Sequence, residues 1–295
     1  MDVALFVTCL TDTFYPRVGE AVVRVLRHFG CRVHFPKRQT CCGQPAYNSG
    51  FHHEAAALIR RLVKVFQDAE HIVTPSASCA TMVRRHGPAL LTEEAGASTA
   101  RQIAGGQPLS QQPNHDRSGA TSSVVPEERS LTVAARSRAA PPKAVGEIAV
   151  AQQVAGRVHE FATFLRDELR LDIGALVRFD EPVTFHYPCH ARDVYTVDDL
   201  RRWLGNGELV RTPARPDLCC GFGGLFAVEY PELSGAMLGD KLDELVRTGA
   251  RLVICNEAAC TLQMAGGARR RGLPLRFKHL AEVLAESLGL MEPAP

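Results

Sequence analysis

A doubled cysteine followed by glycine occurs twice in the chain, as Cys41-Cys42-Gly43 and as Cys219-Cys220-Gly221. Two adjacent thiolates are a strained pair of ligands for one small metal ion, because neighbouring side chains point in different directions. They suit a multi-iron cluster better, since iron–sulfur clusters are held by cysteine thiolates, usually four of them. The glycine removes a side chain and frees the backbone angles, so that the loop can lie against a bulky group. The motif therefore predicts a cluster-binding loop in each half of the chain.

Alternating apolar patterns surround the first motif. A short apolar run typical of a buried parallel strand lies at 3–8, and two further strands are predicted at 31–35 and 71–75. The segments 18–29 and 52–69 place apolar residues at helical spacing. Strands and helices that alternate in this way form βαβ units and a mainly parallel sheet. The sequence therefore predicts an α/β fold.

A cysteine or a cysteine pair follows each of these three strands. Open parallel sheets bind ligands outside the carboxyl ends of their strands. We therefore expect four cysteines of the first half to converge on one edge of the sheet: Cys9, Cys41, Cys42 and Cys79.

The second half repeats this order. The residue numbers of matching cysteines differ by 180 for Cys9 and Cys189, by 178 for Cys41 and Cys219, and by 181 for Cys79 and Cys260. Offsets so nearly constant indicate an internal duplication. We expect two βαβ-type lobes, the first at 1–175 and the second at 180–291.

The duplication also exposes an insertion in the first lobe. A helix predicted from His159 begins 80 residues after Cys79, whereas the matching helix from His279 begins 19 residues after Cys260. The extra residues coincide with a stretch at about 94–150 that is rich in Ala, Ser, Gln, Pro and Gly. Such a composition cannot bury enough apolar surface to offset its ordering entropy, so the stretch is predicted to be a disordered insert.

Composition narrows the class of protein. A chain of 295 residues with 45% hydrophobic content can form two cores without disulfides. Its formal charge of +2 indicates no nucleic-acid partner. The N-terminus lacks the features of a signal peptide, and no apolar run reaches the roughly 18 residues of a membrane span. We expect a cytoplasmic protein, where ten cysteines favour metal or redox use over structural disulfides.

Longer motifs carry a resemblance to a known family. The doubled pattern resembles the cysteine-rich CCG domain shared by the B subunit of heterodisulfide reductase, the iron–sulfur subunit of glycolate oxidase and the C subunit of anaerobic glycerol-3-phosphate dehydrogenase. Four segments together are similar to the lactate-utilisation protein A family, and the resemblance covers nearly the whole chain except the insert. They are Ala4–Leu10, Gln39–Gly50, Pro75–Cys79 and Cys219–Gly224.

The resemblance implies an iron–sulfur electron-transfer subunit of a cytoplasmic system that oxidises L-lactate to pyruvate with two other lactate-utilisation proteins. It implies one iron–sulfur cluster per lobe, a [4Fe-4S] cluster of cubane or non-cubane type, and leaves the electron acceptor and peripheral docking to a membrane open. Some CCG domains carry a fifth cysteine three residues before the last, where this chain has Ser76. The implied ligands are Cys9, Cys41, Cys42 and Cys79 for one site, and Cys189, Cys219, Cys220 and Cys260 for the other.

Other residues stay outside this ligand set. Cys31 begins a strand and is expected to be a small buried apolar side chain, whereas Cys255 remains open as a spare ligand. His186 and His190 flank Cys189 and could tune a cluster, but histidines at strand ends more often bond local backbone groups, which we expect here. No catalytic acid, base or substrate-binding arginine is identified, and the glycines of 221–224 do not have dinucleotide-binding spacing.

Three alternatives remain at this point. Zinc sites typically use closely spaced CxxC pairs, which neither cysteine group has. A zinc-binding interaction protein is therefore a weaker hypothesis than an iron–sulfur protein. A thiol-redox protein could use the adjacent cysteines directly. Within the resemblance, glycolate or glycerol 3-phosphate could replace lactate as the substrate of the complex.

Overall fold

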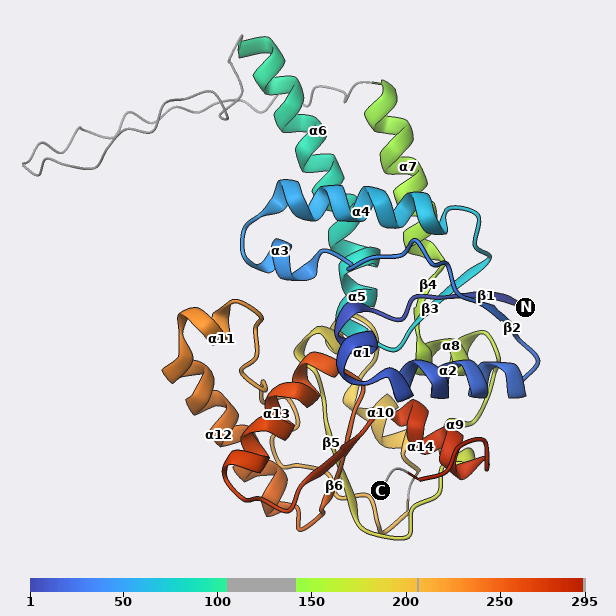
Figure 1. Cartoon of the computed structure of the whole chain (residues 1–295), viewed down its shortest axis with the longest axis vertical. Coiled ribbons are helices and arrows are strands. Elements are labelled where there is room, and N and C mark those ends of the chain that lie inside the picture. Colours follow the sequence, from blue (N-terminus) through green and yellow to red (C-terminus); the bar gives the residue numbers. More distant parts are fainter. Residues whose placement is uncertain (105–141, 206, 294–295) are drawn as a thin grey trace, which may run out of the picture.

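The computed structural model describes residues 1–104, 142–205 and 207–293, with side chains placed in 1–96, 145–205 and 207–293. The middle of the predicted insert at about 94–150 lies outside the described residues. Its two flanks belong to helices α6 (Gly87–Ala104) and α7 (Pro142–Gly156), which pack against each other (Figure 1). The edges of the predicted insert, at 94–104 and 142–150, are therefore helical.

Two parallel sheets confirm the predicted α/β fold. The first has the order β2-β1-β3-β4 and the second the order β5-β6-β7, and every neighbouring pair in both is parallel. The strands are β1 Asp2–Leu5, β2 Arg32–His34, β3 His71–Thr74, β4 Val158–Glu160, β5 Val183–His186, β6 Leu252–Cys255 and β7 Arg276–Lys278.

Helices connect the strands in the predicted order. In the first lobe they are α1 Cys9–Phe14, α2 Pro16–His28, α3 Gln44–Asn48, α4 His52–Phe66, α5 Ala77–Thr81, a π-helical turn at Met82–His86, α8 Phe161–Asp167 and α9 Ile173–Leu176. In the second they are a 3₁₀ turn at Cys189–Asp193, α10 Val197–Trp203, α11 Phe226–Glu229, α12 Pro231–Arg247, α13 Ala258–Arg270 and α14 Leu280–Ser287. The helix predicted to begin at His159 begins instead at Phe161, because His159 pairs with Val73 as part of β4.

Side chains of β1 alternate between two cores. Ala4 and Phe6 pack against α4, α6 and α7 on the outer face of the first sheet. Val3 and Leu5 point to the other face, where α2 and α8 cover them. This period of two is what a strand buried on both faces requires.

The inner faces of the two sheets share one apolar core. The cluster that contains Val3 and Leu5 continues through Phe185 of β5 and Ile254 of β6, and helices α2 and α14 pack side by side across it (Figure 1). A third cluster, between β6 and helices α12 and α13, completes the second lobe. The two duplicated lobes are therefore joined by a common apolar layer.

Among the described residues, none of the helices combines the length and the apolar character needed to cross a membrane.

A buried carboxyl group joins β4 to α8. Glu160 is fully buried, and its Oε2 accepts hydrogen bonds from the backbone N–H groups of Ala162 and Thr163 at 2.9 and 3.1 Å, which caps the helix. Its Oε1 has no partner. Burial raises the pKa of Glu160 to about 8, although the two N–H bonds oppose that shift.

This pKa predicts a pH-dependent stability. The folded protein holds a proton on Glu160 that the unfolded chain releases above about pH 4.5, so the free energy of unfolding should fall between about pH 4.5 and about pH 8. In Glu160→Gln that fall should be smaller by about 2–4 kcal/mol over the same interval. Urea unfolding of the reduced protein at a series of pH values measures it. The exposed Glu93→Gln serves as control, and parallel pH profiles for wild type and Glu160→Gln would contradict the assignment.

Candidate metal centres

Four cysteines of the first lobe meet at the carboxyl end of its sheet, as predicted. Cys9 begins α1 after β1, the adjacent Cys41 and Cys42 lie in the loop after β2, and Cys79 lies in α5 after β3. The Sγ atoms of Cys9 and Cys41 are 3.6 Å apart, and those of Cys42 and Cys79 are 3.2 Å apart. We call this group the first quartet.

The second lobe repeats the arrangement, in a group that we call the second quartet. Cys189 begins the turn after β5, Cys219 and Cys220 lie in a loop before α11, and Cys260 lies in the first turn of α13, after β6. In both quartets the first cysteine is exposed, the second is half-buried and the other two are buried. Matching cysteines of the two lobes therefore share the same degree of burial as well as the same order in the sequence.

One thiol in each quartet is strongly acidic. Hydrogen bonds from the thiols of Cys42 and Cys9 lower the pKa of Cys41 to about 3, with help from the Gly43 N–H at 3.5 Å. Hydrogen bonds from Cys189 and Cys220 likewise lower the pKa of Cys219 to about 2. A metal is bound by the thiolate form of cysteine, so each quartet presents one thiolate at neutral pH. Hydrogen bonds to neighbouring cysteines and burial raise the pKa of Cys9, Cys42, Cys189 and Cys220.

The backbone of both doubled-cysteine loops requires glycine. Gly43 and Gly221 have φ values of +87° and +78°, a left-handed region that residues with a side chain rarely adopt. A Cβ on Gly221 would lie 2.6 Å from the Ser234 carbonyl oxygen, and one on Gly43 would lie 3.1 Å from the Ala55 carbonyl oxygen. The glycines therefore allow the first loop to lie tightly against α4 and the second loop to lie tightly against α12.

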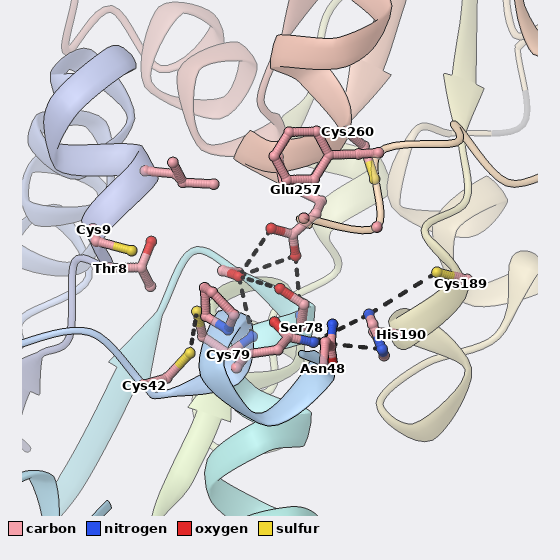
Figure 2. A pocket seen from close by; sticks show the side chains of 18 of the residues that line it. Thr8, Cys9, Cys42, Asn48, Ser78, Cys79, Cys189, His190, Glu257 and Cys260 are labelled. Atoms are coloured by element: carbon pink, nitrogen blue, oxygen red, sulfur yellow. Dashed lines mark hydrogen bonds between the residues drawn. The ribbon is translucent and has the colours of Figure 1, made fainter. Parts of the chain in front are cut away.

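One cavity of about 130 Å³ is lined by both quartets. In Figure 2, Cys9, Cys42 and Cys79 lie on one side of it and Cys189 and Cys260 on the other. The eight sulfurs are thus presented to a single space between the lobes.

The donor set fits iron–sulfur clusters. Each quartet supplies four cysteines, the number that such clusters usually use, and all of them are free thiols. Donor atoms of Cys220, Cys260 and His186 all lie within 4.8 Å of one another, a spacing that one metal centre can span. The residues present therefore suit a thiolate-bound metal group in each lobe.

A buried carboxylate connects the two lobes beside this cavity. Glu257, which precedes α13, accepts hydrogen bonds from Ser76 Oγ at 3.0 Å and from the Ser78 N–H at 3.0 Å (Figure 2). Ser76 in turn accepts a bond from the Cys79 N–H at 3.2 Å. Burial raises the pKa of Glu257, and the serine bonds oppose that shift.

Sequence reasoning considered Ser76 but missed Glu257. The two residues differ by 181, the same offset as Cys79 and Cys260, so they are matching positions of the duplication. That constant offset was the available signal. The position at which some CCG domains have an extra cysteine is filled in both lobes by an oxygen-bearing side chain, and the two side chains bond to each other.

His190 also bridges the lobes. Its ring nitrogens lie 3.3 and 3.4 Å from Gln44 Nε2 of the first lobe and its Nδ1 lies 4.0 Å from Cys189 Sγ, while its carbonyl oxygen accepts a bond from Thr81 Oγ1 at 3.0 Å. The expectation that His186 and His190 bond local backbone groups is wrong. The ring of His190 contacts side chains, and neither ring nitrogen of His186 has a hydrogen-bond partner among the described residues.

The two remaining cysteines lie outside the cavity. Cys31 is buried in the shared apolar core, as expected. The Cys255 thiol donates to the Glu257 carbonyl oxygen at 3.4 Å and lines a separate small cavity with Tyr15 and His279. Cys255 therefore lines a different cavity from the one that the second quartet lines.

Sequence comparison places these centres in a family. The cysteine-rich CCG domain matches the chain twice, at residues 3–84 and 183–265, so this is a protein with two CCG domains. The chain is 34% identical to Lactate utilization protein A of an Exiguobacterium species, with 97% of this chain and 98% of that protein covered. It is 32% identical to Lactate utilization protein A 1 of Bacillus mycoides, with 97% of each chain covered. The chain belongs to the Lactate utilization protein A family.

The contact between Glu257 and the serines predicts a stability loss. Glu257→Ala leaves Ser76 Oγ and the Ser78 N–H without their acceptor and should lower the free energy of unfolding by about 2 kcal/mol. Glu257→Gln keeps an acceptor oxygen and should lose less. Urea unfolding of the reduced protein measures both, with the exposed Glu229→Ala as control. Equal stability of Glu257→Ala and the control would show that these bonds contribute nothing.

The doubled-cysteine loop offers a matched pair of glycines. Gly221 and Gly224 both have positive φ, but a Cβ on Gly224 meets nothing within 4 Å. Each alanine variant should lose about 1–2 kcal/mol through the left-handed backbone, and Gly221→Ala should lose more because its Cβ would collide with Ser234. Equal unfolding free energies for the two variants would argue against the tight turn.

Proposed function

We propose that each quartet holds one iron–sulfur cluster and that the chain is the electron-transfer subunit of a cytoplasmic system that oxidises L-lactate to pyruvate. The observation that carries the proposal is the pair of four-thiol groups that face one cavity. The names of its relatives support lactate as the substrate of the system. The lobes at 1–175 and 180–291 would each bind one cluster.

Chemistry limits the role of this chain. Oxidation of a 2-hydroxy acid removes two electrons and two protons, which needs a flavin, a nicotinamide or another two-electron acceptor. An iron–sulfur cluster supplies one-electron transfer. No flavin or nicotinamide motif occurs in the sequence, so partner subunits of the lactate-utilisation system would carry the first step.

The chain's own residues would hold and shield the clusters. Cys9, Cys41, Cys42 and Cys79 bind one cluster, and Cys189, Cys219, Cys220 and Cys260 bind the other. The N–H groups of Gly43 and Gly221 point at Cys41 and Cys219 at 3.5 and 3.4 Å and stabilise negative charge on those sulfurs. Burial of the two inner cysteines of each quartet keeps water from most of the centre.

Two alternatives are less well supported. A zinc-binding protein would also use four thiolates, but neither quartet contains the CxxC pairs usual in such sites. A thiol-redox protein would use the short contacts between Cys9 and Cys41 and between Cys42 and Cys79, yet it gives no reason for eight thiols around one cavity. Glycolate or glycerol 3-phosphate as substrate remains the alternative within the wider group of CCG proteins.

Anaerobic purification tests the cluster assignment. The wild-type protein should contain iron and acid-labile sulfide and give two electron paramagnetic resonance signals after reduction. Cys42→Ser and Cys220→Ser should each abolish one signal and keep the other, because each removes a buried ligand from one lobe. Cys31→Ser, which changes a cysteine of the apolar core, should keep both. Colourless protein with stoichiometric zinc, or unchanged signals in both ligand variants, would contradict the assignment.

Growth of a deletion strain tests the substrate. The strain should fail to grow on L-lactate and recover with the wild-type gene but not with a gene that encodes both ligand changes. Normal growth on L-lactate, together with a defect on glycolate or glycerol 3-phosphate, would assign the chain to a different oxidation.

A further inference from the structure

His186 occupies an unusual place for a histidine. It is the last residue of β5, is fully buried, and lies on the face of the second sheet that α12 and α13 cover. Its donor atom and the Sγ atoms of Cys220 and Cys260 all lie within 4.8 Å of one another. The imidazole therefore lies beside the two innermost sulfurs of the second quartet.

Within the part of the chain that the structure describes, neither ring nitrogen of His186 has a hydrogen-bond partner. A neutral imidazole carries one N–H donor and one acceptor nitrogen, and buried polar groups in proteins are almost always bonded. An unpartnered imidazole in a closed apolar site is therefore costly unless a group bound at that site accepts the N–H. The sulfurs of Cys220 and Cys260, once they are thiolates that bind a metal, are acceptors within 4.8 Å of it.

The first lobe has no counterpart of this imidazole. The offset of 180 between Cys9 and Cys189 places Phe6 at the position that matches His186. Phe6 is also buried, and its ring packs edge-on against Phe66 at a centroid distance of 5.6 Å. A hydrocarbon ring thus lies beneath the first quartet where an N–H donor lies beneath the second.

A buried lysine is a second difference between the surroundings of the two quartets. Lys241 of α12 is fully buried, and its Nζ donates to the Pro216 carbonyl oxygen at 3.3 Å. Burial lowers the pKa of Lys241, and the nearby Cys255, Glu244, Cys220 and Cys260 oppose that shift. Both His186 and Lys241 therefore favour negative charge at the second quartet.

We propose that His186 donates a hydrogen bond to a metal-bound sulfur of Cys220 or Cys260 and thereby raises the reduction potential of the second centre above that of the first. This proposal rests on the proposed function, since it needs a cluster in each lobe. Reduction adds one negative charge to a cluster, so a hydrogen bond to its sulfur stabilises the reduced form more than the oxidised form. When one electron moves between the lobes, the first centre is oxidised and the second is reduced.

The test is a redox titration of the anaerobic protein with both clusters bound, followed by electron paramagnetic resonance. Cys42→Ser and Cys220→Ser assign each signal to a lobe. His186→Phe places in the second lobe the side chain found in the first, and should lower the second midpoint so that the ratio of reduced to oxidised second centre falls about tenfold at a fixed potential. His186→Gln retains an N–H donor and should keep most of the wild-type midpoint.

Two further measurements separate a hydrogen bond from other roles. Wild-type protein labelled with ¹⁵N-histidine should show a weak nitrogen coupling to the second centre that is smaller in His186→Phe, with the remainder assigned to His190 beside Cys189. Tyr187→Phe removes a hydroxyl on the same segment, which bonds the Tyr195 carbonyl oxygen, and should leave both midpoints unchanged.

Each outcome decides the proposal. An unchanged second midpoint in His186→Phe, a first centre with the higher potential, or a strong nitrogen coupling from direct metal ligation would overturn it while the cluster assignment stands. Absence of iron and sulfide from the wild-type protein would overturn the proposed function as well. A fall of the second midpoint in His186→Phe, with recovery in His186→Gln, is the expected result.

Discussion

The two cysteine quartets can share a cavity only because the lobes are fixed against each other at the carboxyl ends of their sheets. The buried carboxylate of Glu257 supplies the polar part of that constraint, since it binds the first turn of α5 through Ser76 and Ser78. His279 adds a bond beside it, where its Nε2 lies 2.9 Å from the carbonyl oxygen of Pro75, the residue before Ser76. The apolar core that the two lobes share supplies the apolar part of the same constraint. A rotation of one lobe would break these bonds at the same time as it opened the cavity.

Local patterns in the sequence predict much of this arrangement. Apolar runs followed by cysteines predict parallel strands that deliver thiols to one edge, and the nearly constant offsets predict the duplication. Both expectations are confirmed by the two parallel sheets and by the two matches to the CCG domain. The positive φ of Gly43 and Gly221 likewise follows from the need for a tight turn after two adjacent cysteines.

The features that the sequence did not reveal depend on contacts between the halves. Glu257 has no motif of its own, and its role arises only because Ser76 of the other lobe faces it. The apolar residues of β1 predict a strand buried on both faces but not that one face meets the core of the second lobe. For His186, strand position alone favoured local backbone bonding, whereas its ring nitrogens have no hydrogen-bond partner among the described residues.

The depth of the cysteines has a further consequence for how a cofactor could enter. Cys9 and Cys189 are exposed at the rim, while Cys42, Cys79, Cys220 and Cys260 are buried at the base. Transfer of a preformed cluster between proteins proceeds by exchange of one thiolate for another, so the rim cysteines are the first that a delivering protein can reach. The same two positions are the last to be released if a cluster departs by the reverse route. Under the proposed function, the difference in burial would give each lobe an order of cluster assembly, from the exposed cysteine to the buried ones.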